Sequence, residues 1–205
     1  MKKTVICNIP MKKDLDKMVY PCVDPTLPLS KRAVSYPVNA YLERIMEKDD
    51  EIKVILLIKK DPERNYLRNA EAFVGELMAA NENIGARITQ VMVESEFDES
   101  RSVHEELLGR IVDEIENGSH IISDITYGPK DLPIVLFTAL NFAEKYLDCE
   151  IDNIVYGQVD FIDKKPANPR FCDMAPLYYL NSITNTVRVD DPDKAREILK
   201  RLISV

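Results

Sequence analysis

Short apolar runs rich in β-branched residues alternate along this chain with longer segments in which apolar residues recur every three or four positions. The runs predict five buried strands, at residues 4–9, 52–58, 88–93, 121–126 and 151–157. The second run is almost unbroken Val, Ile and Leu, as is typical of a strand that helices cover on both faces.

The segments between the runs predict amphipathic helices. Ser35 precedes Pro37 at the start of the first helix, an arrangement typical of a capping residue followed by proline in the first turn, and this helix is expected to end near residues 49–50. Further helices are predicted from Asn65, from about Ser102 and around Pro133. Because strand and helix alternate, the sequence predicts an α/β fold with a Rossmann-like, doubly wound, mostly parallel sheet.

The pattern changes after residue 158. Residues 159–162 and 170–174 flank a turn-rich segment at 164–169, which predicts an appended C-terminal β-hairpin with its turn there. A short helix at 176–182 and a terminal helix at 192–203 follow. We therefore expect a single domain over residues 1–205, with the core sheet in 1–158 and the hairpin and C-terminal helices in 159–205.

A long segment between Pro10 and Ser35 has little periodicity and contains three more prolines. Loops of this length in a compact domain are often lids or binding loops, and a plain surface excursion is the alternative.

Composition narrows the classes of function. The chain of 205 residues carries a formal charge of −8, which argues against coating of long duplex nucleic acid. It has no apolar run long enough for a membrane span and no signal peptide, so a cytoplasmic protein without membrane contact is expected. Its four cysteines have neither zinc spacing nor a disulfide framework, and no metal site or cofactor is expected.

The stretch DITYGPKDLP, residues 124–133, has the parts of an anion site. Thr126 offers a hydroxyl, Gly128 exposes backbone N–H groups, Lys130 adds positive charge, and a helix start follows. Asp124 either orients this loop by hydrogen bonds or acts as a base. The chain has no Gly-x-Gly-x-x-Gly or Walker loop, and its two histidines stand in no triad pattern.

Three ordered motifs resemble a known family. They are the stretch 124–133, the strand end Ile-Val-Tyr-Gly-Gln at 154–158, and Cys-Asp-Met-Ala-Pro-Leu at 172–177. Together they resemble the CARF domains, the CRISPR-associated Rossmann-fold sensors of type III CRISPR antiviral defence. The chain differs from the family pattern at Tyr127, Pro129 and Lys130, where His, an aromatic residue and Arg are usual. Lys130 keeps the charge of Arg without its bidentate geometry.

The resemblance implies a homodimer that binds a cyclic oligoadenylate, with cyclic tetra-adenylate favoured, in a pocket shared by two subunits. Carried over by position, the ligand-binding residues are Asn8, Pro10, Met11, Lys12, Thr126, Tyr127, Gly128, Pro129 and Lys130. Some similar domains are ring nucleases, in which a ribose 2′-hydroxyl attacks the adjacent phosphate without a metal. Thr126 and Lys130 are the residues carried over to such catalysis.

Other interpretations stay open at this point. One is a nucleotide- or flavin-binding enzyme on a Rossmann or flavodoxin-like sheet, and another is an interaction scaffold without a ligand. Sensors of the family usually carry an effector domain, and the residues after Val187 are too few to form one. We therefore expect either a stand-alone sensor or part of a longer protein.

Overall fold

The computed structural model describes residues 1–186 and 188–203, and these contain a six-stranded sheet. The strand order is β3-β2-β1-β4-β5-β6, in which β1 to β5 are parallel and β6 is antiparallel to β5. The bounds are β1 (Lys2–Asn8), β2 (Glu51–Lys60), β3 (Arg87–Glu96), β4 (His120–Asp124), β5 (Glu150–Ile162) and β6 (Lys165–Asp173). The predicted α/β fold with a mostly parallel sheet is confirmed.

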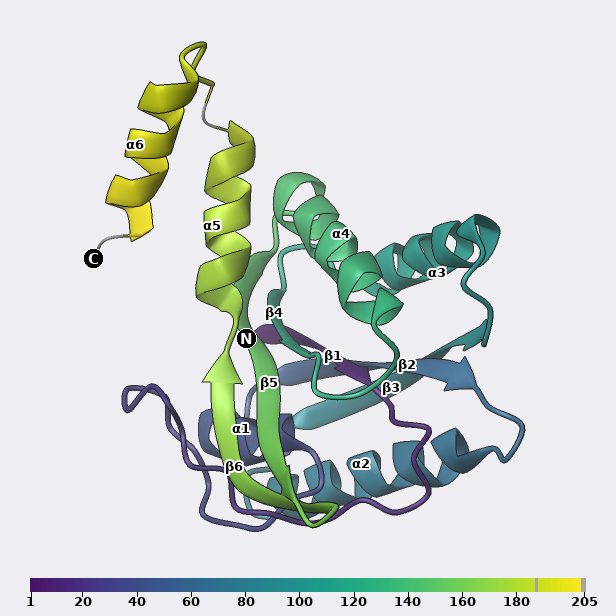
Figure 1. The fold of residues 1–205 in the computed structure, drawn as a ribbon. Coiled ribbons are helices and arrows are strands. Elements are labelled where there is room, and N and C mark those ends of the chain that lie inside the picture. The colour runs from purple at the N-terminus through teal and green to yellow at the C-terminus, as the bar shows by residue number, and fades with distance from the viewer. Residues whose placement is uncertain (187, 204–205) are drawn as a thin grey trace.

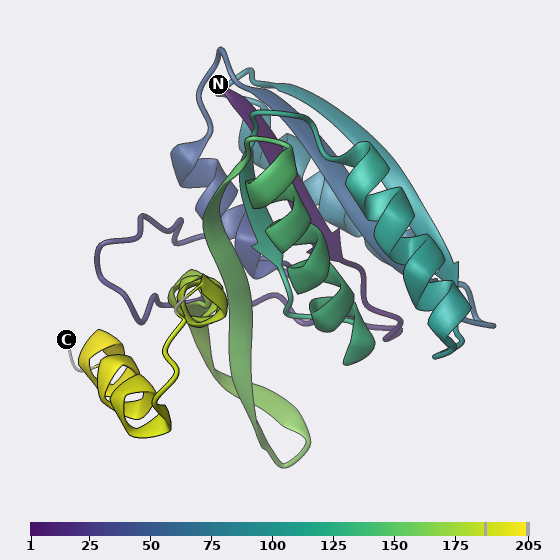
Figure 2. The same ribbon diagram turned by 90° about the horizontal axis from the view of Figure 1, so that it is seen from above.

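Four helices cover the two faces of the sheet (Figures 1 and 2). Helices α1 (Pro37–Ile45) and α2 (Asn65–Asn81) lie on one face, and α3 (Arg101–Glu114) and α4 (Asp131–Tyr146) lie on the other. Successive strand residues point to opposite faces, so Val54 and Leu56 join the core under α1 and α2 while Ile55 and Leu57 join the core under α3 and α4. This double burial explains why β2 is apolar at nearly every position.

The hairpin differs from its prediction, because the turn expected at 164–169 is wrong. Strand β5 runs on to Ile162, and Asp163 and Lys164 make the turn with φ of 51° and 64°. Segment 165–169 instead begins β6, and Phe161 pairs with Pro166. Proline lacks an N–H donor and is tolerated here because β6 is the last strand of the sheet.

The first helix also departs from its prediction. Pro37 lies in the first turn as expected, but Ser35 is not the cap, since Tyr36 holds that position. The backbone N–H of Ser35 donates to the Glu76 carboxylate at 2.9 Å. The helix ends at Ile45, before the expected 49–50.

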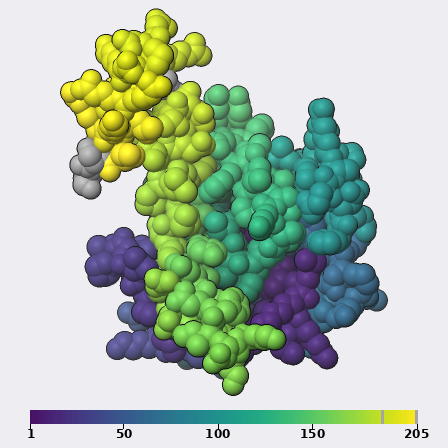
Figure 3. All heavy atoms as spheres, in the orientation of Figure 1, coloured from purple at the N-terminus to yellow at the C-terminus, as the bar shows by residue number. Residues whose placement is uncertain are grey.

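Two helices follow the sheet, α5 (Ala175–Thr186) and α6 (Pro192–Ile203). Helix α5 packs beside β5, and α6 protrudes from the body of the molecule with no buried residue among those described (Figure 3). Within residues 1–186 and 188–203, no helix has the length and apolar character needed to cross a membrane.

The sheet has a topological switch point between β1 and β4. From β1 the chain passes to α1 on one face, and from β4 it passes to α4 on the opposite face. In doubly wound sheets, this divergence opens a crevice at the carboxyl ends of the two strands, where ligands bind. The end of β1 and the stretch 124–133 therefore border the candidate ligand site.

Candidate functional site

Asn8 and Gly128 lie side by side at the switch point, although they are far apart in the sequence. A Cβ added to Gly128 would lie 3.5 Å from the Asn8 Cβ and 2.8 Å from Leu132 Cδ1. The φ of Gly128 is +91°, a conformation that favours glycine. Glycine at this position therefore permits the close approach of the hinge to the end of β1.

The Asn8 side chain is a buried amide. Its exposed fraction is 1%, and neither its Nδ2 nor its Oδ1 has a hydrogen-bond partner within the described part of the chain. A buried polar group without a partner destabilises a fold by about 1–3 kcal/mol. Native structures satisfy such groups with water or a ligand, so Asn8 is a candidate contact for a polar molecule at the switch point.

Asp124 holds the hinge in shape. Its carboxylate accepts hydrogen bonds from the backbone N–H groups of Thr126, at 2.7 Å, and Val38, at 3.3 Å. Burial raises the pKa of Asp124 to about 6, although the hydrogen bonds from Thr126 and Val38 act in the opposite direction. Because both bonds fix backbone, the geometry favours the orienting role over that of a base.

The next two hinge residues also use their hydroxyls for structure. The Thr126 Oγ1 accepts the backbone N–H of Gly157 at 2.8 Å, which ties the hinge to β5. The Tyr127 hydroxyl donates to the Ser35 carbonyl at 2.7 Å, and its ring packs edge-on against Tyr36. Burial raises the pKa of Tyr127 above its usual range, so this phenol stays protonated. The hydroxyl and the ring of Tyr127 are therefore both held by contacts within the fold.

The residues directly before α4 are the most exposed part of the hinge. Lys130 is exposed directly before the helix, and Pro129 is half-buried. The first turn of a helix carries a partial positive charge that attracts anions. In α4, however, Pro133 has no N–H, the Leu132 N–H donates to the Pro129 carbonyl at 3.3 Å, and Asp131 adds a negative charge, so the attraction depends on Lys130.

Asn69, on α2, anchors the loop after β1 and was missed by sequence reasoning. Its side-chain amide donates to the carbonyls of Pro10, at 2.7 Å, and Lys12, at 2.9 Å. Pro10 is buried, Met11 is half-buried, and Lys12 is exposed with its ammonium 3.7 Å from the Asp16 carboxylate. An asparagine inside a helical pattern gives no local signal for such a contact, because its partner carbonyls lie far away in the sequence.

A cavity of about 300 Å³ adjoins the hinge on the side of the hairpin. Three of the predicted residues line it, namely Lys12, Thr126 and Tyr127. The predicted residues outside its lining are Asn8, Pro10, Met11, Gly128, Pro129 and Lys130. The rest of the lining was not predicted and comes from the long loop and the hairpin: Leu15, Asp16, Met18, Tyr20, Tyr156, Gly157, Val159, Phe161 and Pro166.

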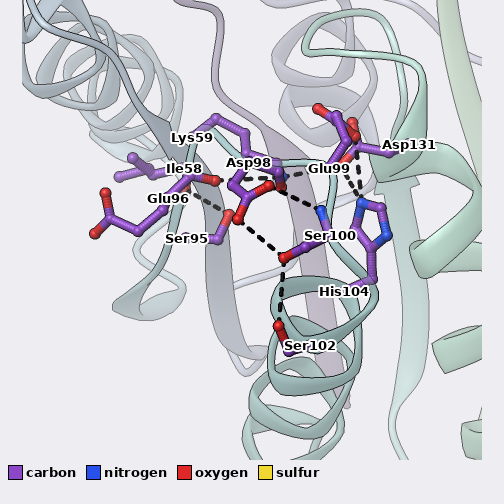
Figure 4. Close-up of polar contacts among 10 residues, drawn as sticks. All are labelled: Ile58, Lys59, Ser95, Glu96, Asp98, Glu99, Ser100, Ser102, His104 and Asp131. Atoms are coloured by element: carbon purple, nitrogen blue, oxygen red, sulfur yellow. Dashed lines mark hydrogen bonds and ion pairs between the residues drawn. The ribbon is translucent and has the colours of Figure 1, made fainter.

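A polar cluster lies between the starts of α3 and α4, beside a second cavity of about 450 Å³ (Figure 4). The buried Lys59 ammonium is 3.0 Å from the Asp131 carboxylate, and His104 Nε2 lies 3.2 Å from that same carboxylate and 3.3 Å from Glu99. Burial alone would raise the pKa of Asp131, but Lys59 brings it below its usual value.

The donor atoms of Glu99, His104 and Asp131 lie within 4.8 Å of one another, as metal ligands do. However, Lys59 already neutralises the Asp131 oxygen that faces His104. A divalent cation there would sit close to a buried ammonium group, which is electrostatically unfavourable. We therefore interpret the cluster as an ion-pair network that fixes the start of α4.

The fold is that of a doubly wound α/β domain, and its switch point is the candidate ligand site. Comparison of the chain with protein-family models and with curated proteins finds no match. The resemblance to CARF domains therefore remains a prediction, and the geometry of the crevice is the structural basis for a proposed function.

Proposed function

We propose that a homodimer of this chain binds a cyclic oligoadenylate, with cyclic tetra-adenylate favoured, as a CARF-type sensor of a type III CRISPR system. The observation that carries the proposal is the partnerless, buried amide of Asn8 beside Gly128 at the switch point, within the described part of the chain. An amide offers both donors and an acceptor, which suits the hydroxyl and phosphate groups of a nucleotide.

The surroundings of Asn8 support an anionic ligand. Lys130 supplies an exposed positive charge directly before α4, where it can pair with a phosphate oxygen. The chain as a whole carries a charge of −8, so this local positive charge favours a small anion over a long nucleic acid.

Slow cleavage of the ring is a second part of the proposal. In that reaction a ribose 2′-hydroxyl loses its proton and its oxygen attacks the adjacent phosphorus, the bond from phosphorus to the 5′-oxygen breaks, and a 2′,3′-cyclic phosphate and a protonated 5′-hydroxyl result, with no net change in protons. Lys130 would stabilise the charge that develops on the phosphate. Thr126 would help to position the ligand, and its own hydroxyl is held in place because it accepts the Gly157 N–H.

The test is calorimetric titration with cyclic tri-, tetra- and hexa-adenylate, followed by analysis of the products after prolonged incubation. Lys130→Ala should weaken ring binding at least about tenfold, as expected for loss of a charge-assisted hydrogen bond. The matched control is Lys145→Ala, which removes an exposed lysine from the far end of the same helix.

The outcomes separate the two parts of the proposal. If the protein binds none of the three rings, the sensor function is wrong. If it binds a ring without forming linear products, the sensor function stands and the nuclease activity does not. Equal cleavage rates for Lys130→Ala and the parent protein would exclude the catalytic role of Lys130.

A further inference from the structure

The cavity beside the hinge has aromatic walls that the fold leaves open to solvent. Tyr156 and Phe161, both on β5, are 38% and 67% exposed and line this cavity of about 300 Å³. Leu15, Met18 and Tyr20 of the long loop contribute apolar lining from a different part of the chain. Figure 3 shows the light green hairpin next to the purple N-terminal segment on this face.

The lining combines apolar faces with a few polar groups at the edge. Lys12 and Asp16 are 61% and 55% exposed, and Thr126 adds a hydroxyl from the hinge. A flat heteroaromatic ring with donors and acceptors on its rim matches this arrangement, since its faces stack on aromatic side chains and its rim meets polar groups. The volume is near the lower end of the range for small-molecule sites, about 300–1,000 Å³, and so suits a single base.

The cavity is physically joined to the hinge. The Gly157 N–H donates to Thr126, and a side chain at position 157 would collide with Pro37 at the start of α1. These contacts hold the start of the hairpin, at Gly157, against Thr126 in the hinge and Pro37 in α1. Thr126 and Tyr127 line this cavity, and Gly128 to Lys130 follow them directly in the hinge, so the cavity adjoins the segment proposed to contact the phosphate.

We propose that this cavity is a nucleobase subsite, in which one adenine of the bound ligand packs against the aromatic lining to which Phe161 and Tyr156 contribute. The proposal rests on the function proposed above and adds residues to its site. Asp16 provides an acceptor for the exocyclic amino group of adenine, and Lys12 provides a donor for a ring nitrogen.

The test compares the affinity of the parent protein for cyclic tetra-adenylate with those of Phe161→Ala and Tyr156→Ala. Each substitution should weaken binding about tenfold, as expected for the loss of one stacking partner, and Phe161→Trp should restore it. Phe97→Ala is the matched control, because Phe97 is 58% exposed and does not line the cavity. Thermal unfolding of each variant checks that the fold is retained.

Parent-like affinity in both alanine variants would overturn the subsite while leaving the sensor function intact. If the parent protein binds no ring, the sensor function fails and the subsite is tested alone by saturation-transfer NMR with AMP and with ribose 5-phosphate. Base-dependent binding that disappears in Phe161→Ala would support the subsite. Equal signals from the two compounds, or an unchanged signal in Phe161→Ala, would overturn it.

Discussion

Two asparagines near the crevice illustrate opposite uses of the same side chain. The Asn69 amide donates two hydrogen bonds to the loop after β1, whereas the Asn8 amide has no partner in the described part of the chain. Replacing a satisfied buried amide with an apolar side chain leaves its partners unpaired, whereas replacing an unsatisfied one removes a penalty. Substitutions at Asn8 and Asn69 can therefore distinguish an effect on ligand binding from an effect on the free energy of unfolding.

We predict that Asn8→Leu leaves the free energy of unfolding unchanged or raises it, while ring affinity falls at least about tenfold. Asn69→Leu should instead lower the free energy of unfolding by about 1–3 kcal/mol, because the buried hydrogen bond to the Pro10 carbonyl and the partly buried one to the Lys12 carbonyl are lost. Urea unfolding and calorimetric titration of both variants measure the two effects. Equal destabilisation by Asn8→Leu and Asn69→Leu would show that the Asn8 amide is a structural group.

The buried carboxylate of Asp124 makes stability depend on pH. Its pKa in the folded protein is about 6, above the ordinary value of 3.8, because burial disfavours the charged form. Between about pH 4 and pH 6 the folded state therefore holds more protons than the unfolded state. The stability that protonated Asp124 contributes is fully present below pH 4 and is lost as pH rises through 6.

We predict that the parent protein loses roughly 3 kcal/mol relative to Asp124→Asn as pH rises from 4 to 7. Asparagine stays neutral and keeps an oxygen that accepts the Thr126 N–H. Urea unfolding at four pH values measures the difference, and Asp113→Asn on the exposed face of α3 controls for the loss of one carboxylate. Parallel curves for Asp124→Asn and the parent protein would contradict the prediction.

At the scale of elements, the start of α4 depends on a contact with β2. Lys59 is fully buried, and its ammonium lies 3.0 Å from Asp131 in the first turn of α4 (Figure 4). The same ammonium donates to the carbonyl of Glu96 at 3.4 Å. Removal of one partner of a buried ion pair leaves an uncompensated charge, which is more harmful than the loss of an exposed pair.

We predict that Lys59→Met lowers the free energy of unfolding by about 3–5 kcal/mol. Adding Asp131→Asn should recover part of the loss, because the unpaired carboxylate is then removed. Lys60→Met is the control, since Lys60 pairs with Glu94 and Glu96 at the surface and should change stability little. Denaturant unfolding of the three variants measures the effect, and equal losses for Lys59→Met and Lys60→Met would contradict it.

The sequence predicted the strands of the parallel core, whereas no local pattern in it predicted the lining of the hinge cavity. Each strand of the parallel core follows from its apolar run, and α6 was predicted with the bounds that the structure has. The hairpin turn was misplaced because proline and asparagine in segment 164–169 resemble a turn, and only the position of β6 at the sheet edge makes them acceptable in a strand. The lining of the hinge cavity was missed because it joins a loop, the hinge and the hairpin, which no local pattern connects.

At the scale of the whole molecule, the size of the cavity limits what one chain can hold. A volume of about 300 Å³ accommodates one base, and a ring of four nucleotides carries four. The other nucleotides of a bound ring would therefore lie outside this cavity. A ring with two-fold symmetry fits two such sites that face each other across the axis of a homodimer.

We therefore predict a dimer that binds one cyclic tetra-adenylate for every two chains. Light scattering after size exclusion measures the mass without and with the ring, and calorimetry measures the stoichiometry, expected to be half a ring per chain. Linear tetra-adenylate is the control, because it presents the same bases without closure and must lose more conformational freedom on binding, so it should bind more weakly. A monomer that binds one ring per chain would contradict the shared pocket, because each chain would then hold the entire ring by itself.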